Sequence, residues 1–146
     1  MLAEICSAVE ALSKNRVGAL IAIERNEPLK LYVESGDRID SLVSADLIQT
    51  IFTPNSLLHD GGVIIQDGRI SAAGCLFPLT ANQELNRAFG TRHRAAIGLS
   101  EETDALIVIV SEERHDISLV FESKLYKDLS KEELLVKLKE ILKEKG

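Results

Sequence analysis

The sequence is short of several residue types that mark particular classes of protein. Trp is absent and aromatic residues make up 4% of the chain, so a surface that stacks the bases of single-stranded nucleic acid is poorly supported. The two cysteines, Cys6 and Cys75, lie far apart, and neither has a second Cys or a His at metal-ligand spacing. We interpret them as reduced, buried thiols of a cytosolic protein.

Long apolar runs are also missing. No segment approaches the roughly 18 apolar residues that a membrane-spanning helix needs, and the N-terminus lacks the charged and apolar regions of a signal peptide. We therefore expect a cytoplasmic chain without a membrane segment, although a longer protein that contains it is free to be membrane-anchored. The net charge of −6 argues against a nucleic-acid binder, because phosphate backbones require a broad basic face.

What is present is typical of one soluble globular domain: 146 residues, of which 45% are hydrophobic and 27% charged. Asp67-Gly68 predicts a tight hairpin turn, Thr91 a helix N-cap, and Ser130 with Glu133 a capping box. Apolar spacing predicts helices over residues 2–14, from Ser41 or Ser44 to 52, around 84–88, over 91–99 and from 130 onwards, and strands over 17–23, 29–33, 63–65, 70–77, 105–110, 117–121 and 124–126. The predicted fold is a single α/β domain, with a central mixed β-sheet of about six or seven strands flanked by helices.

Two short polar clusters interrupt this apolar pattern. The first is His59-Asp60-Gly61-Gly62, which places a carboxylate beside backbone that carries no side chains. The glycines allow a ligand to approach the main chain closely. An ordinary turn is the alternative, because Asp-Gly is a common turn pair. His59 either orients the carboxylate, assists a metal, or is a half-buried histidine without a functional role.

The second cluster is Thr91-Arg92-His93-Arg94, at the start of a predicted helix. With Arg87, these residues concentrate positive charge in an acidic chain. Cations are unfavourable at a helix N-terminus, where free N–H groups already attract anions, so a bound phosphate or carboxylate would explain them. The alternative is that an arginine pairs with Glu101 or Glu102. For Arg94 the two interpretations are equally open, because successive helix residues cannot all face one site.

Further candidates follow the predicted strands. Ser111, Glu112 and Glu113 come directly after the most apolar run, where carboxylates occur in nucleotide sites and also in plain surface turns. Phe77-Pro78 closes another strand and forms either an apolar wall for a base or part of the core. We interpret His115 and the lysines of residues 124–145 as solvated surface.

These motifs, in this order and spacing, resemble those of the diadenylate cyclase (DAC) domain family, which makes cyclic di-AMP from two ATP molecules. The family's Asp-Gly-Ala motif falls on Asp60-Gly61-Gly62 and its Arg-His-Arg motif on Arg92-His93-Arg94. The flanks are also similar: Phe-Thr-Pro-Asn before the first motif, Gly-Thr-Arg-His-Arg-Ala-Ala-Ile-Gly around the second, Val-Ser-Glu-Glu after the central strand, and Gly18-Ala-Leu near the start. The likeness covers nearly all of residues 1–146. Gly62 departs from it by replacing the usual alanine, which adds backbone freedom but leaves the carboxylate in place.

The resemblance implies a role for each candidate. Asp60 and Gly61 would act in catalysis, with Asp60 binding Mg²⁺ or Mn²⁺ and helping to activate a ribose 3′-hydroxyl. Weaker candidates for the metal are His59 and Glu113. The clamp on the triphosphate would comprise Thr91, Arg92 and His93, of which Arg92 and His93 also stabilise the developing charge. The remaining substrate contacts would come from Gly62, Leu76, Phe77, Ser111 and Glu113, with Leu76 and Phe77 lining the adenine pocket.

Since one such site binds one ATP, the resemblance further implies a homodimer or higher homo-oligomer that places two sites face to face. ATP is then the small-molecule partner, and neither nucleic acid nor a membrane is expected to bind. A nucleotide-binding regulatory module with little turnover, marked by Gly62, is the main alternative. A nucleotide hydrolase that uses the same clamp is a third.

Overall fold

A computed structural model describes residues 1–84 and 90–144 of the chain. Within this part the fold is built around a seven-stranded mixed sheet with the order β2-β4-β3-β1-β5-β6-β7. β1 and β3 run parallel, and the other neighbouring strands run antiparallel. The strands are β1 (Ala19–Ile23), β2 (Asp37–Leu42), β3 (Gly62–Gln66), β4 (Arg69–Cys75), β5 (Leu106–Val110), β6 (Ile117–Phe121) and β7 (Lys124–Tyr126). The predicted mixed sheet is confirmed.

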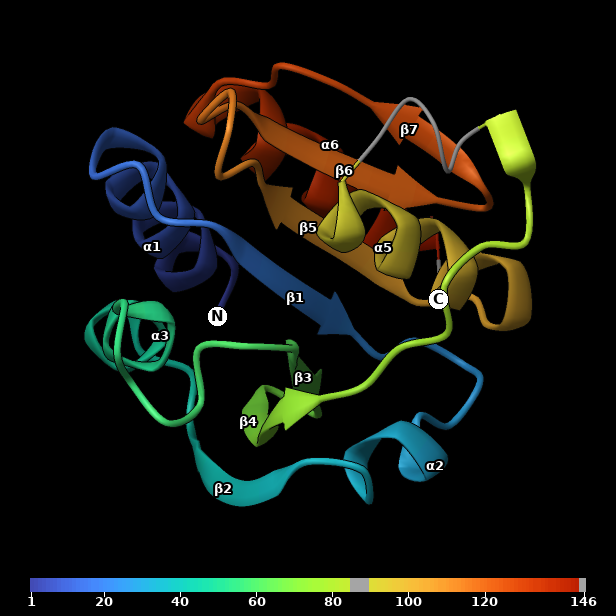
Figure 1. Ribbon diagram of the computed structural model, residues 1–146. Coiled ribbons are helices and arrows are strands. Elements are labelled where there is room, and N and C mark those ends of the chain that lie inside the picture. Colours follow the sequence, from blue (N-terminus) through green and yellow to red (C-terminus); the bar gives the residue numbers. More distant parts are fainter. Residues whose placement is uncertain (85–89, 145–146) are drawn as a thin grey trace.

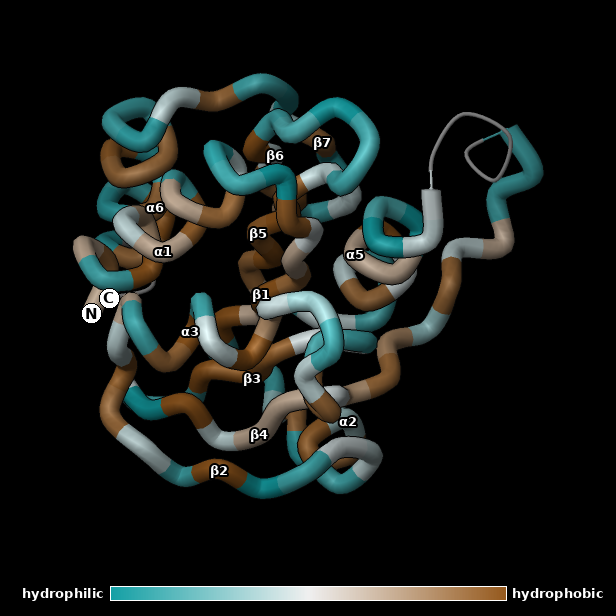
Figure 2. The backbone as a smooth tube through the Cα atoms, turned by 60° about the vertical axis from the view of Figure 1, so that its left-hand side comes forward, coloured by the Kyte–Doolittle hydropathy of each residue, from teal (hydrophilic) through white to brown (hydrophobic). Residues whose placement is uncertain are grey.

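Helices cover both faces of this sheet (Figure 1). The described helices are α1 (Leu2–Lys14), α2 (Lys30–Val33), α3 (Ala45–Phe52), α5 (Thr91–Glu102) and α6 (Lys131–Glu144). Figure 2 shows α1, α3 and α6 on one side of the strands and α2 and α5 on the other, with the most hydrophobic backbone between them. No helix among the described residues has both the length and the apolar character needed to cross a bilayer.

The core strands are apolar at every position because both of their faces are buried. In β5, Leu106, Val108 and Val110 face the layer of α1, α3 and α6, while Ile107 and Ile109 face the layer of α2 and α5. All five residues of β1 are likewise buried. This two-sided burial explains why a short, continuous apolar run identified the centre of the sheet from sequence.

Several local predictions are confirmed by hydrogen bonds. Ser44 caps α3 through its hydroxyl, which accepts the N–H of Leu47 at 3.3 Å. Ser130 and Glu133 form the capping box of α6: the Ser130 hydroxyl accepts the Glu133 N–H at 3.0 Å, and the Glu133 carboxylate accepts the Ser130 N–H at 2.9 Å. Asp67 and Gly68 join β3 to β4 with φ angles of 49° and 75°, as expected of a tight hairpin turn.

The predicted strand over residues 29–33 is wrong, because this segment contains helix α2. Leu29 and Val33 are buried, whereas Leu31 between them is 73% exposed. A spacing of four residues on one face suits a helix, and the two-residue alternation of a strand would have buried Leu31 as well. The missed strand β2 is a polar edge strand with a bulge at Asp40 (φ 54°), so it carries little apolar signal.

Smaller corrections concern the ends of elements. β4 ends at Cys75, so Leu76 and Phe77 follow the strand and do not belong to it. The N-cap of α5 is Gly90, and Thr91 is the first helical residue. The short helix predicted around residues 84–88 falls largely outside the described residues, as does Arg87.

The candidate site lies at the edge of the sheet that is formed by the ends of its strands, not at an outermost strand. β1 and β3 begin at this edge, whereas the antiparallel β4 and β5 end there, as the pairings Gly62 with Cys75 and Ala19 with Val110 show. Asp60 lies two residues before β3, and Ser111 directly follows β5. The N-terminus of α5 lies over the same edge, so segments distant in sequence meet there.

Candidate functional site

The two polar clusters open onto one cavity of about 880 Å³, here called the large cavity. Asp60 and Gly61 line it from the start of β3, and Thr91 and Arg92 line it from the start of α5. Its apolar lining includes Leu20, Leu76, Phe77, Leu79 and Ala95. This volume lies within the range of about 300–1,000 Å³ found for small-molecule sites. The cavity therefore combines an apolar wall with a carboxylate and a guanidinium.

Asp60 is oriented by a local hydrogen bond. Its carboxylate accepts the N–H of Gly61 at 3.1 Å, and the side chain is otherwise exposed to solvent. Gly61 has a φ of +89°, and a Cβ atom there would lie 2.7 Å from the carbonyl oxygen of Cys75. Glycine is thus required at residue 61 both by the backbone conformation and by the close approach of β4.

His59 is oriented by a carbonyl group. Its Nδ1 atom lies 2.7 Å from the carbonyl oxygen of Ser56. Since a carbonyl oxygen only accepts hydrogen bonds, Nδ1 carries the proton and Nε2 of the neutral ring keeps its lone pair. His59 also lines the large cavity beside Asp60. The arrangement is one in which a histidine can bind a metal or accept a proton.

Arg92 lies across the backbone of Gly18, the residue before β1. A Cβ atom at Gly18 would come within 2.6 Å of Nη1 and 2.7 Å of Cζ of Arg92. The same Nη1 atom donates to the carboxylate of Glu112 at 3.0 Å. Arg92 therefore pairs with neither Glu101 nor Glu102, the two acids considered from sequence. Gly18 provides the space for the guanidinium, and Glu112 holds it by charge.

We expect Gly18→Ala to weaken ATP binding by about tenfold, because a displaced guanidinium loses a charge-assisted hydrogen bond. The backbone at Gly18 is not left-handed, so alanine strains no backbone angle there. Calorimetric titration with ATP measures the loss. In an Arg92→Ala background the same substitution should have no further effect, and an equal loss in both backgrounds would contradict the role assigned to Gly18.

Arg94 does not reach the large cavity with Arg92. Its Nη2 atom donates to the Thr91 hydroxyl at 3.4 Å, and its buried Nε has no hydrogen-bond partner among the described residues. Neither cavity described here is lined by Arg94. The structure thus separates the two arginines of the motif and favours a structural interpretation of Arg94.

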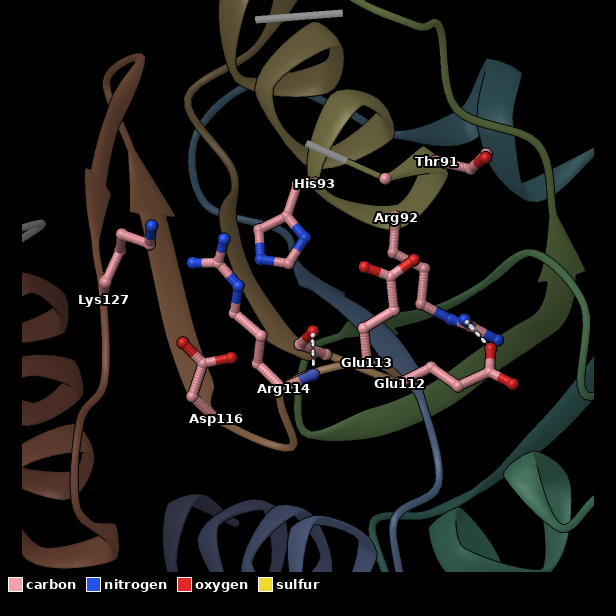
Figure 3. Close-up of a pocket in the computed structure, with 10 residues that line it drawn as sticks. Thr91, Arg92, His93, Glu112, Glu113, Arg114, Asp116 and Lys127 are labelled. Atoms are coloured by element: carbon pink, nitrogen blue, oxygen red, sulfur yellow. Dashed lines mark hydrogen bonds and ion pairs between the residues drawn. The ribbon is translucent and has the colours of Figure 1, made fainter. Parts of the chain in front are cut away.

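A second, more polar cavity of about 490 Å³ adjoins the first and is here called the small cavity. It shares Thr91, Arg92 and Glu112 with the large cavity. His93, Ser111 and Glu113 line the small cavity and not the large one. Arg114, Asp116 and Lys127 complete its wall (Figure 3). Apart from Gly62, which lines neither cavity, the candidate residues predicted from sequence are thus divided between two adjoining cavities, with Arg92 at their junction.

The N-terminus of α5 lies at this junction. Gly90, the N-cap, has no side chain that could satisfy the first N–H groups of the helix. These groups and the helix dipole favour an anion at this point, as expected from sequence. On the opposite wall, the Ser111 hydroxyl accepts the N–H of Arg114 at 3.1 Å, which holds the chain after β5 against the small cavity. The N-terminus of α5 therefore gives the small cavity a place where an anion such as phosphate can bind.

Sequence reasoning missed Arg114, Asp116 and Lys127. Lys127 is exposed, as interpreted, but it lines the small cavity. The interpretation of His115 as solvated surface is wrong: the residue is half-buried with a φ of 65°, and its carbonyl accepts the Ser13 hydroxyl. The one available signal was the position of residues 114–116 directly after the Ser-Glu-Glu run, at the same strand end.

His93 is 9% exposed, and Figure 3 shows its ring pointing from α5 toward Arg114 and Lys127. Burial lowers the pKa of His93 below its ordinary value of 6.5. The negative charge of Asp116 opposes this shift, and that of Glu113 does so more weakly. The positive charges of Lys127 and Arg114 add to it. The ring is therefore neutral near pH 7, able to donate one hydrogen bond and accept one.

This burial predicts a pH dependence of stability. The unfolded chain takes up a proton near pH 6.5, whereas folded His93 takes it up only at lower pH. The contribution of His93 is therefore complete above the unfolded pKa and is lost as pH falls below it toward the folded pKa. Urea unfolding in metal-free buffer at several pH values between about 5 and 7 measures this loss. The decline should be shallower for His93→Gln, and an equally steep decline would contradict the assignment.

Potential metal ligands near the large cavity are few. The described residues contain no group of three or more His, Cys, Asp or Glu side chains able to hold an ion by themselves. Asp60 and His59 line the large cavity, while Glu113 lines the small one. This donor set fits Mg²⁺ or a similar ion, which commonly binds one or two carboxylates together with substrate phosphates and water.

Comparison with known proteins connects this geometry to a family. The family profile described as "DisA bacterial checkpoint controller nucleotide-binding" (DAC) matches residues 6–125, which include both motifs and the strands that position them. The chain belongs to the DAC family. The resemblance noted from the motifs is thereby confirmed over most of the chain.

Among curated relatives, "Cyclic di-AMP synthase CdaA" from Bacillus subtilis strain 168 is 42% identical over 130 residues, covering 89% of this chain and 48% of the relative. "Diadenylate cyclase" from Listeria monocytogenes is 40% identical over 143 residues, covering 97% and 52%. The chain thus spans about half the length of the curated relatives it matches.

Solved structures agree with the fold. The crystal structure of a double mutant of DacA from Staphylococcus aureus superimposes with a TM-score of 0.93 at 43% identity, covering 97% of this chain and 94% of that one. A hypothetical membrane-spanning protein from Bacillus cereus superimposes with a TM-score of 0.82 at 42% identity, covering 86% and 61%. The single mixed α/β domain is therefore shared with experimentally determined relatives.

Proposed function

We propose that this DAC domain is a nucleotidyltransferase that condenses two ATP molecules into cyclic di-AMP with release of pyrophosphate. The observation that carries the proposal is the convergence of Asp60 and Arg92 on one cavity that also has an apolar wall. The names of the relatives, diadenylate cyclase and cyclic di-AMP synthase, support the same reaction. The activity belongs in the cytoplasm, where ATP is available.

In this proposal each part of ATP has its own place. The adenine lies against Leu76 and Phe77 in the large cavity, near the backbone of Gly62. The triphosphate extends past Thr91 and Arg92 into the small cavity. There His93, Ser111 and Glu113 surround the phosphates, and the N–H groups at the start of α5 stabilise their charge.

In the reaction, the 3′-hydroxyl oxygen of one ATP attacks the α-phosphorus of the other. The new O3′–P bond forms as the bond between the α-phosphorus and the bridging oxygen breaks, and pyrophosphate leaves with that oxygen. Asp60 accepts the hydroxyl proton or holds the hydroxyl in the attacking position. Arg92 donates hydrogen bonds to the phosphate oxygens as their negative charge increases. Two such reactions close the cyclic dinucleotide.

A divalent ion, Mg²⁺ or Mn²⁺, would be held by Asp60, with His59 Nε2 and Glu113 as further ligands. When bound, it would neutralise phosphate charge and favour ionisation of the hydroxyl. The protein's own contribution is to orient these donors. His59 is fixed by Ser56, and Asp60 by the backbone of Gly61.

Two copies of the domain are needed because one cavity accommodates one ATP. We propose a face-to-face homodimer, or a higher homo-oligomer built from it, in which the reacting groups meet. Exposure at the cavity mouth supports this arrangement: Asp60 is exposed, as are Leu76 (68%) and Leu79 (51%). Bringing the two ATP molecules together converts an encounter in solution into an effectively unimolecular step.

Incubation of the protein with ATP and Mn²⁺, followed by mass analysis of the product, tests the proposed activity. Cyclic di-AMP and pyrophosphate are the expected products. Unchanged ATP in the presence of measurable nucleotide binding would instead favour a regulatory module with little turnover. Release of ADP or AMP would favour a hydrolase, and either result would contradict the proposed reaction.

A further inference from the structure

Gly62, the first residue of β3, lies next to the aromatic ring of Phe77. A Cβ atom at Gly62 would lie 2.6 Å from both Cε2 and Cζ of that ring, and 3.4 Å from Cδ2 of Leu20. A separation of 2.6 Å is too short for two carbon atoms. The backbone of Gly62 is not left-handed, so the position of the Phe77 ring, and not the backbone conformation, is what leaves no room for a side chain here.

Phe77 is held from several sides. Tyr32 of α2 packs against it edge to face, with ring centroids 6.3 Å apart and an interplanar angle of 89°. Leu20 and Ala95 belong to the same apolar cluster, and Phe77 is 9% exposed. The ring also lines the large cavity. Because β3 lies on one side and Tyr32 on another, the cavity is the open side toward which the ring can move.

We propose that Gly62 is a positioning residue for the nucleobase, which acts through Phe77. Its missing side chain allows the ring to lie back against β3, and this position sets the depth of the apolar end of the large cavity. The inference rests on the proposed function, since it requires a nucleotide whose base occupies that end. A methyl group at residue 62 drives the ring into the space for the base, while Thr91 and Arg92 keep their places at the phosphate end.

Three variants test this coupling: Gly62→Ala, Phe77→Leu and the double variant. Calorimetry measures the affinity of each for two probes, an ATP analogue with a methylene group between the α- and β-phosphates, and inorganic tripolyphosphate. Gly62→Ala should weaken binding of the ATP analogue by about tenfold, as expected when a packed site is overfilled. Binding of tripolyphosphate, which has no base, should be unchanged. The double variant should recover to within about threefold of Phe77→Leu.

The comparison of Phe77→Leu with the double variant keeps the test valid even if Gly62→Ala does not fold. With leucine at residue 77, alanine at residue 62 should cost little affinity, and a tenfold loss would overturn the inference. Equal losses for both probes would also overturn it, since they indicate general damage. Phe121→Leu, at the end of β6 where the ring packs on Arg25, is the matched control for losing an aromatic ring.

Probe binding by the unsubstituted chain, here called the parent chain, distinguishes a failure of this inference from a failure of the proposed function. If the parent chain binds neither probe, the proposed nucleotide site itself is contradicted. If it binds both probes and Gly62→Ala binds the ATP analogue equally well, only the role of Gly62 is overturned.

Discussion

Asp60→Asn should abolish dinucleotide synthesis and leave ATP binding measurable. Asparagine keeps the size of the side chain and can still accept the Gly61 N–H, but it loses the negative charge and cannot take up the hydroxyl proton. We expect product formation to fall by about a thousandfold, within the range that positioned general bases contribute. The contacts proposed for the triphosphate lie at the other end of the site, on α5 and after β5, so affinity should change much less than turnover.

The chain contains its own matched control for this variant. Asp67 also precedes a glycine, but it forms the exposed β3–β4 turn with a φ of 49°. Asparagine is well suited to that conformation, so Asp67→Asn should keep full activity. Rates of cyclic di-AMP formation and ATP affinities, measured for both variants, show whether the loss is specific to Asp60. Undiminished synthesis by Asp60→Asn would remove Asp60 from the mechanism.

Arg92→Ala should weaken nucleotide binding by about thirtyfold, which corresponds to the roughly 2 kcal/mol of a charge-assisted hydrogen bond. Two effects act in the same direction. The guanidinium at the junction of the two cavities is lost, and Glu112, its partner at 3.0 Å, is left with an uncompensated negative charge near the phosphates. Turnover at saturating ATP should also fall, because we propose that the same group stabilises the transition state.

Arg69→Ala is the corresponding control. Arg69 also pairs with a carboxylate, that of Asp40 at 2.8 Å, but this pair lies where β4 begins, far from Cys75 at the other end of the strand. Its removal should leave nucleotide affinity unchanged. Titration with ATP in the absence of turnover compares the two variants, and an unchanged affinity of Arg92→Ala would overturn the assignment of the clamp.

The elements that were predicted well are those in which buried residues recur at a regular spacing along the sequence. β5 is apolar at every residue because it is covered on both faces, and α6 combines a capping box with apolar residues at helical spacing. β2 was missed because a polar edge strand buries little, and α2 was mistaken for a strand because four residues contain too few repeats to distinguish the two periods.

The sequence named candidate residues for the site but not the contacts between them. Motif spacing identified Asp60 and Arg92, and the topology of the sheet brings them together at one edge. That Arg92 rests on Gly18 and pairs with Glu112 depends on how β1, α5 and the segment after β5 approach one another, which no local pattern encodes. The same is true of Gly62 and Phe77, whose contact decides the space at the base end. Arg114 and Lys127 were likewise not recognised as cavity residues.

A crystal structure of this DAC domain with the methylene-bridged ATP analogue and Mg²⁺ tests the central claim most directly. We expect the base against Leu76 and Phe77, the triphosphate beside Thr91 and Arg92, and Asp60 facing the nucleotide of a second copy of the chain. A nucleotide bound outside the large cavity, or an Asp60 carboxylate remote from any ribose hydroxyl, would contradict it.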